Sequence, residues 1–101
     1  MSRDLAYGKE KFRKAVKILS GRESPQVRLR LAFQYELHLL DSLNLSTDLW
    51  SEFVSIKNRV TRSKDTAVNE REGLISAVCA KLSDSEANEL IERLLSIAKR
   101  V

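Results

Sequence analysis

Two side chains of this 101-residue sequence could carry out nucleophilic or acid–base chemistry, the single cysteine Cys79 and the single histidine His38. Nucleophilic catalysis needs a thiol or hydroxyl beside a base that a third group orients. Cys79 shares an apolar helical face with Ile75 and Leu82, which predicts a small buried core residue. His38 has Asp41 one helical turn away, which predicts a partly exposed surface imidazole. We therefore expect no catalytic residue and no enzymatic activity.

Residues that could hold a metal or a cofactor are equally scarce. One cysteine and one histidine are too few for a transition-metal site, and a single cysteine excludes an internal disulfide. The three glycines stand alone at Gly8, Gly21 and Gly73, so a glycine-rich phosphate loop is absent. We expect no cofactor and no small-molecule substrate.

Glu36 interrupts an apolar stripe, at an angle between Phe33 and Leu40 on an expected helix. A buried carboxylate is costly unless it is paired, so we expect a cation from another helix to face it. Arg28 lies on the same side but is eight residues away, too far for pairing along the helix. Three interpretations stay open: a structural ion pair, a position in a groove or subunit interface, and a catalytic or ligand-binding acid.

A second apolar surface on the same helix is formed by Val27, Leu31 and Tyr35, away from the main stripe. In a small bundle this side lacks an obvious intramolecular neighbour. Uncovered apolar surface of this kind is typical of a protein-binding site or a homodimer interface. Together with Glu36, these residues are our candidate protein interface.

Positive charge is concentrated near the N-terminus, where residues 1–31 carry a net charge of +6 against +4 for the whole chain. Lys9, Arg13, Lys14 and Lys17 fall in one arc opposite the apolar stripe of the first expected helix. This candidate basic patch could contact nucleic-acid phosphates, acidic lipids or an acidic protein. The solvated side of an amphipathic helix is the simpler interpretation, because no aromatic residue among the cations could stack on bases.

Hydrophobic periodicity indicates the helices that must position these residues. A first helix, capped by Ser2, is expected to run to about Ser20, with Gly21 ending it in the left-handed conformation. Gly8 lies in its apolar arc, which suggests the close approach of a neighbouring helix. A second helix, capped by Ser24, is expected over Pro25–Leu43 and should be central, because it is apolar around much of its circumference.

The second half of the chain predicts two or three further helices. A third begins at Thr47, and the polar stretch Thr61–Asn69 indicates a loop or frayed junction before a fourth helix over Thr66–Leu82. Because no glycine or proline enforces that break, one long helix over Thr47–Leu82 is the alternative. Ser83–Glu86 has the pattern of a capping box and predicts the start of a last helix that continues to the end of the chain.

Composition agrees with this pattern. Three glycines and one proline are too few for a turn-rich β-sandwich or barrel, and 101 residues suit a single helical domain, residues 1–101. No stretch approaches the roughly 18 apolar residues of a membrane span, so we expect no membrane association. A lone cysteine and the lack of a secretory signal favour the cytoplasm.

A further set of residues, chiefly helix caps and core positions, is spread over most of the chain. They are Gly8-Lys9-Glu10-Lys11, Ala15-Val16, Arg28-Leu29, Ala32, Leu49, Phe53, Ile56, Glu72-Gly73, Ile75, Leu82 to Ala87, Leu90-Ile91 and Leu95. In these residues the chain resembles a group of small bacterial all-helical proteins with no assigned activity. The resemblance implies a free-standing helical protein and supplies no catalytic or binding residues.

The sequence thus predicts an all-α antiparallel bundle of four to five helices. We expect a small cytoplasmic interaction or regulatory module that binds another protein, or a second copy of itself, through an apolar helix face. The alternative is a nucleic-acid-associated protein that contacts phosphates through its basic first helix.

Overall fold

The computed structural model describes residues 5–61 and 78–101, and every regular element in these two ranges is helical. The elements are α1 (Leu5–Leu19), α2 (Pro25–Tyr35), the 3₁₀ helix η1 (Leu37–Leu39), α3 (Thr47–Thr61) and α5 (Asp84–Arg100). A further helical turn, residues 78–81, precedes α5. The expected all-α class is therefore confirmed.

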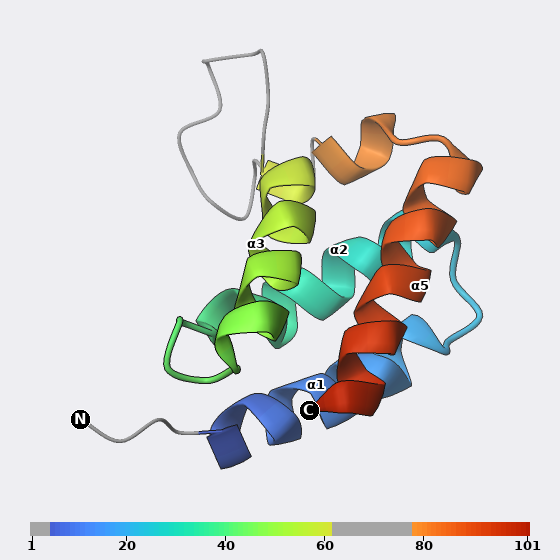
Figure 1. The fold of residues 1–101 in the computed structure, drawn as a ribbon. Coiled ribbons are helices and arrows are strands. Elements are labelled where there is room, and N and C mark those ends of the chain that lie inside the picture. Colours follow the sequence, from blue (N-terminus) through green and yellow to red (C-terminus); the bar gives the residue numbers. More distant parts are fainter. Residues whose placement is uncertain (1–4, 62–77) are drawn as a thin grey trace.

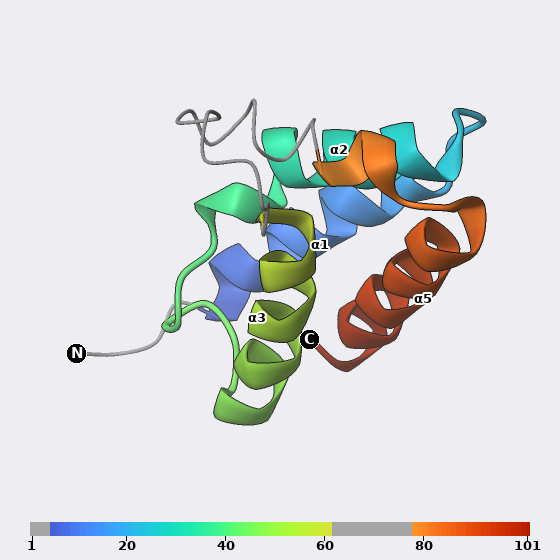
Figure 2. The same cartoon turned by 90° about the horizontal axis from the view of Figure 1, so that it is seen from above.

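Helix α2 lies along one side of the bundle, behind α3 and α5 in the view of Figure 1 and at the upper edge in Figure 2. It packs against α1 and α5, and α5 in turn packs against α1 and α3. α1 and α2 run in opposite directions, as do α3 and α5. The predicted antiparallel arrangement is confirmed, whereas α5, and not the second helix as expected, makes extensive contacts with each of α1, α2 and α3.

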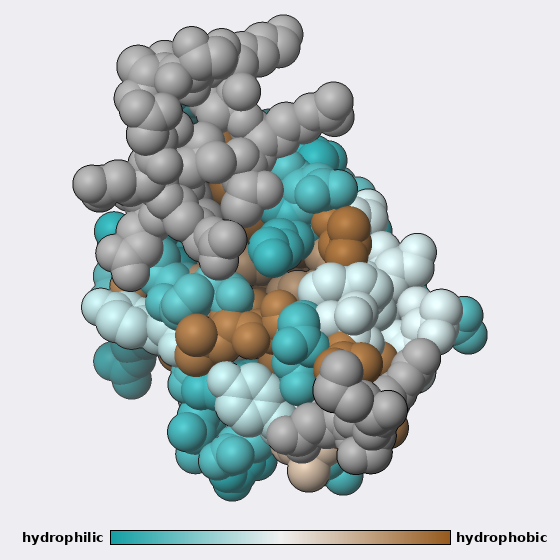
Figure 3. All heavy atoms as spheres, turned by 90° about the vertical axis from the view of Figure 1, so that its left-hand side faces the viewer, coloured by the Kyte–Doolittle hydropathy of each residue, from teal (hydrophilic) through white to brown (hydrophobic). Residues whose placement is uncertain are grey.

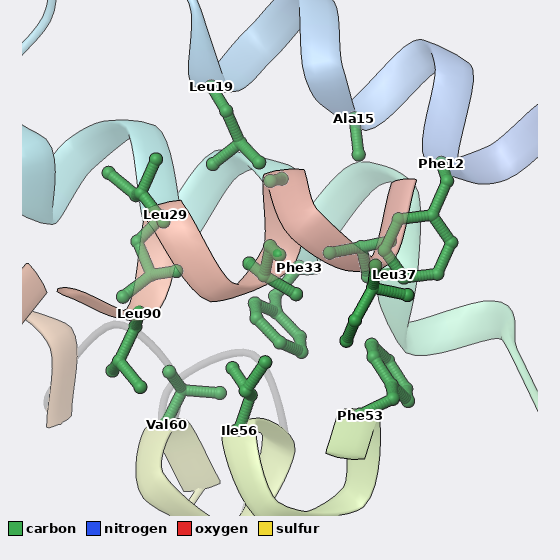
Figure 4. Packing of buried hydrophobic residues seen from close by; sticks show 14 of the residues in the cluster. Phe12, Ala15, Leu19, Leu29, Phe33, Leu37, Phe53, Ile56, Val60 and Leu90 are labelled. Atoms are coloured by element: carbon green, nitrogen blue, oxygen red, sulfur yellow. The ribbon is translucent and has the colours of Figure 1, made fainter. Parts of the chain in front are cut away.

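The hydrophobic core lies between α1 on one side and α3 on the other, with Phe33 of α2 in the middle (Figure 4). Phe33 is stacked on Phe53 of α3, with ring centroids 5.8 Å apart, and Phe12 of α1 meets the same ring edge-on at 5.8 Å. Such aromatic pairs stabilise a core beyond the area they bury. Three helices therefore meet at one aromatic cluster.

The two ends of α1 compare differently with the prediction. Its first described residue, Leu5, is 49% exposed and is not part of the core, and the expected cap Ser2 lies outside the described residues. Gly21 does not adopt a positive φ. Its N–H donates to the carbonyl of Ile18 over 3.1 Å, which tightens the last turn of α1. A 3₁₀-type bond therefore ends this helix, and the predicted left-handed glycine is wrong.

Gly8 is buried and makes the close approach that its place in the apolar arc predicts. Its neighbour is a loop and not a helix: a Cβ at residue 8 would collide with the backbone carbonyl of Asn44. The absence of a side chain at Gly8 thus allows the loop before α3 to lie directly on α1.

The largest departure from the prediction is the end of α2, which stops at Tyr35 instead of Leu43. The chain turns at Glu36, whose backbone φ and ψ are −126° and −56°, and continues as the tighter helix η1. In a 3₁₀ helix, side chains three residues apart eclipse one another. Leu37 and Leu40 therefore point to the same side and are both buried in the core.

Local capping signals in the sequence are confirmed. The Ser24 hydroxyl accepts a hydrogen bond from the N–H of Val27, and Pro25 occupies the first turn of α2. Ser83 and Glu86 form a reciprocal capping box at the start of α5, with both hydrogen bonds at 3.1 Å. Short-range hydrogen bonding thus specifies where these helices begin.

The predicted loop Thr61–Asn69 and the start of the fourth helix, expected at Thr66, fall largely outside the described residues. So does the choice between two helices and one long helix over Thr47–Leu82. Among the helices that the structure does describe, none combines the length and the apolar character needed to cross a membrane.

Candidate functional site

The predicted interface residues on α2 differ in exposure. Val27 and Leu31 are half-buried, whereas the Tyr35 side chain is 66% exposed. Tyr35 is the last residue of α2. The exposed part of this candidate interface is therefore at the C-terminal end of the helix.

Exposed apolar side chains continue beyond Tyr35 into η1 and the following loop. Leu39 is 46% exposed and Leu43 is 37% exposed, and hydrophobic surface gathers on the side of the molecule that carries these elements (Figure 3). We call Tyr35, Leu39 and Leu43 the exposed apolar segment. Aromatic and aliphatic side chains on a surface are typical anchors of protein–protein contacts.

Hydrogen bonds hold this segment in place. Nδ1 of His38 lies 2.8 Å from the carbonyl oxygen of Phe33. Because a carbonyl only accepts, Nδ1 must carry a proton, and the imidazole closes the end of α2. In the loop, the Asp41 carboxylate accepts from the N–H of Leu43, and the Asn44 side-chain oxygen accepts from the N–H of Asp41, both at 2.8 Å. Hydrogen bonds thus fix the backbone that carries the exposed apolar side chains.

Glu36 does not belong to the exposed surface. Its carboxylate points toward α1, where Oε2 lies 3.7 Å from Nζ of Lys11, and both side chains are largely buried. Nζ of Lys11 also lies 5.4 Å from the centre of the Tyr7 ring. The cation expected from another helix is therefore Lys11, and the pair joins α1 to the turn after α2. This geometry corresponds to the structural ion pair among the three interpretations.

All four residues of the basic patch are exposed on α1. Lys14 forms an ion pair with Glu10, one turn earlier, at 3.7 Å. Lys9, Arg13 and Lys17 instead line a groove between α1 and the last turn of α5. The basic patch therefore has two parts. Lys14 is paired with an acidic residue of its own helix, and the other three cations lie along the groove.

Cys79 is buried in the hydrophobic core, as the sequence predicts. Burial raises the pKa of its thiol from an ordinary 9.0 to about 11, and the nearby charge of Arg30 opposes this only in part. A thiol of that pKa is protonated at neutral pH and is a poor nucleophile. Within the described ranges, no group of three or more His, Cys, Asp or Glu side chains could hold a metal ion.

Leu39, Leu43 and Lys11 were not singled out as surface or pairing residues by the sequence pattern. Leu39 and Leu43 fit the apolar stripe of a continuous helix, and only the break at Glu36 exposes them. The cluster Asp41-Ser42-Leu43-Asn44 carries the signal for a loop, because Asp and Asn side chains form local turns. Lys11 has no comparable local signal, since its partner is 25 positions away in the chain.

Comparison with known proteins adds no family. No protein-family model matches the chain, and no curated protein or solved structure is detectably similar to it. The resemblance to small bacterial helical proteins stays a prediction.

Proposed function

We propose that the protein is a small non-catalytic interaction module that binds another protein through the exposed apolar segment. The observation that carries this proposal is the exposure of three large side chains, Tyr35, Leu39 and Leu43, within nine residues. Full burial of an exposed large apolar side chain is worth about 1.5–3 kcal/mol, and these three side chains, which are 37–66% exposed, forgo part of that stabilisation in water. A partner that covers them recovers part of this free energy.

The shape of the segment supports rigid docking. Leu37 and Leu40 anchor η1 in the core, and His38 and Asn44 hold the chain on either side. A preorganised surface loses little conformational entropy on binding, which favours affinity. The module can thus act by simple coverage of an apolar surface, in a regulatory or scaffolding role.

The simplest partner is a second copy of the chain, which would form a homodimer. A homodimer is compatible with the resemblance to free-standing bacterial proteins. A cytoplasmic location is part of this proposal. It is supported by Cys79, a free thiol within the core of the described residues, which suits a reducing compartment.

Two double variants test the proposal. Y35S/L39S removes apolar surface, whereas Y35F/L39M retains it at the same positions. Light scattering after size exclusion, across a hundredfold range of protein concentration, measures self-association. Affinity capture from the native host with both variants identifies partners. We expect either self-association or the capture of a specific partner to be lost in Y35S/L39S and kept in Y35F/L39M. A monomer whose captured proteins are the same for both variants would contradict the proposal.

A further inference from the structure

A groove of about 400 Å³ lies between α1 and the C-terminal turn of α5, and no residue of the exposed apolar segment lines it. Val16, Ala98 and Val101 line it and are partly buried. Lys9, Arg13 and Lys17 line it and are exposed. The groove therefore has an apolar floor and a positively charged rim along α1.

The three rim cations are not neutralised within the described parts of the chain. The ion pairs there join Lys11 to Glu36, Lys14 to Glu10, Arg59 to Glu86 and Arg100 to Glu52, and none involves a rim residue. Cations beside an apolar floor attract a ligand that offers negative charge and apolar surface together.

The spacing of the cations specifies the ligand further. Lys9, Arg13 and Lys17 are four residues apart on one helix, so successive cations rise by about 6 Å along its axis. Carboxylates at every fourth position of another helix have the same rise. We propose that the groove binds an acidic amphipathic helix of a partner protein, with its carboxylates toward the rim and its apolar side chains on Val16 and Ala98.

Two other anionic ligands fit the groove less well. Nucleic acid would place phosphates and sugars against an apolar floor, and no aromatic side chain lines the groove to stack on a base. A membrane-surface helix inserts its apolar side into lipid. The apolar side of α1, with Phe12, Ala15 and Leu19, is already buried in the core. A protein helix satisfies both the floor and the rim.

The test uses the full chain and a synthetic, fluorescein-labelled alanine-based helix of about 18 residues, long enough to be helical in water. The probe carries Glu at three positions four residues apart and Leu three residues after each Glu. A control peptide carries Lys in place of Glu. Fluorescence anisotropy measures binding. We expect the acidic peptide to bind and the basic peptide not to bind.

Two charge-matched variants distinguish the groove from a diffuse basic surface. R13Q/K17Q removes two rim cations, and K14Q/R22Q removes two exposed basic residues outside the groove. We expect R13Q/K17Q to weaken peptide binding by about tenfold and K14Q/R22Q by less than about twofold. A98Q, which places a polar side chain on the floor without changing the charge, should also weaken binding. Circular dichroism confirms that each variant folds.

Equal weakening by the two charge variants would overturn the proposal, and so would unchanged binding in A98Q. Single-stranded DNA, or phosphatidylcholine–phosphatidylserine vesicles, that bind more tightly than the peptide and lose binding in R13Q/K17Q would also overturn it. Y35S/L39S should bind the peptide normally, because the groove is built from other elements. Failure of the proposed function and failure of this inference are therefore distinguishable.

Discussion

The guanidinium of Arg28 on α2 donates a hydrogen bond to the carbonyl oxygen of Leu19, the last residue of α1, over 2.7 Å. Its Nε donates a second one to the carbonyl of Glu23 in the connecting turn, over 2.9 Å. Helix C-termini leave carbonyls without intrahelical partners, and a cation there also interacts favourably with the helix dipole. Arg28 thus completes the end of α1 and ties it to α2.

We expect R28A to destabilise the fold by about 1–2 kcal/mol, because it leaves the partly buried Leu19 carbonyl without its charged donor. R28K keeps the charge but loses the two-pronged geometry, so its loss should be intermediate. Urea unfolding measures both. An R28A variant as stable as the wild type would show that water replaces the guanidinium without cost.

Gly8 gives a second prediction, because it lies against the backbone of Asn44. In an ordinary exposed helix, replacing glycine by alanine is stabilising by up to about 1 kcal/mol. Here the added methyl group meets a carbonyl that cannot rotate away, so we expect G8A to be destabilising by about 1–3 kcal/mol. Thermal unfolding checks the sign. Increased stability of G8A would mean that the loop before α3 moves aside freely.

Features of the fold that depend on residues close in the chain were predictable from the sequence, whereas features that depend on distant residues were not. Ser24 and the capping box at Ser83 were predictable because their partners lie three residues away. In α3 the apolar residues Phe53 and Val60 recur at helical spacing and are buried on one side, because a single period describes the whole helix. These features depend on neighbours along the chain.

The end of α2 could not be predicted in the same way. Leu37 and Leu40 fit a continuous helix as well as they fit η1, and the choice depends on how closely α1 and α3 approach them in the core. The exposure of Leu39 and the pairing of Glu36 with Lys11 follow from that choice. The sequence therefore predicted the candidate surface at Tyr35. Its extension to Leu39 and Leu43 depends on tertiary structure.

The capping box predicts a pH dependence. The pKa of the Glu86 carboxyl is lowered, chiefly by the hydrogen bond that it accepts from the Ser83 backbone N–H, then by the Ser83 side chain, and to a lesser extent by the charge of Arg59. Because the folded-state pKa lies below the unfolded one, the stabilisation is present above the unfolded-state value. It is lost as the pH falls through the folded-state value.

We expect S83A to raise the Glu86 pKa only in part, because alanine keeps the backbone N–H and removes only the side-chain contribution. The variant should cost about 1 kcal/mol at neutral pH through loss of the N-cap. S83T retains the hydroxyl and should preserve both properties. Carboxyl titration by NMR measures the pKa, and urea unfolding measures the stability. A Glu86 pKa in the ordinary range in the wild-type protein would indicate that the capping box does not persist in solution.

Cys79 predicts low thiol reactivity in the folded protein. With a pKa of about 11 against an ordinary 9.0, its thiolate population at neutral pH is about a hundredfold smaller than that of an exposed cysteine. Its burial further restricts access. Labelling with a disulfide reagent should be slow in buffer and fast in urea. Rapid labelling of the folded chain would mean that this part of the core opens frequently.

For the ion pair of Lys11 and Glu36, we expect removal of the lysine to cost more stability than removal of the glutamate charge. Oε2 of Glu36 has no hydrogen-bond partner among the described residues, so Lys11 is the group that compensates its charge. Removing the cation in K11M leaves a largely buried carboxylate alone, and we expect a loss of about 1–3 kcal/mol. E36Q leaves a lysine that can extend toward solvent, and it should cost less.

The double variant K11M/E36Q removes both charges and should be more stable than K11M alone, because no uncompensated charge then remains. A double-mutant cycle from urea unfolding at neutral pH gives the coupling energy of the pair. Additive losses would mean that the two side chains do not interact. Glu36 would then be an unpaired carboxylate near α1, and its ligand-binding interpretation would regain weight over the structural one.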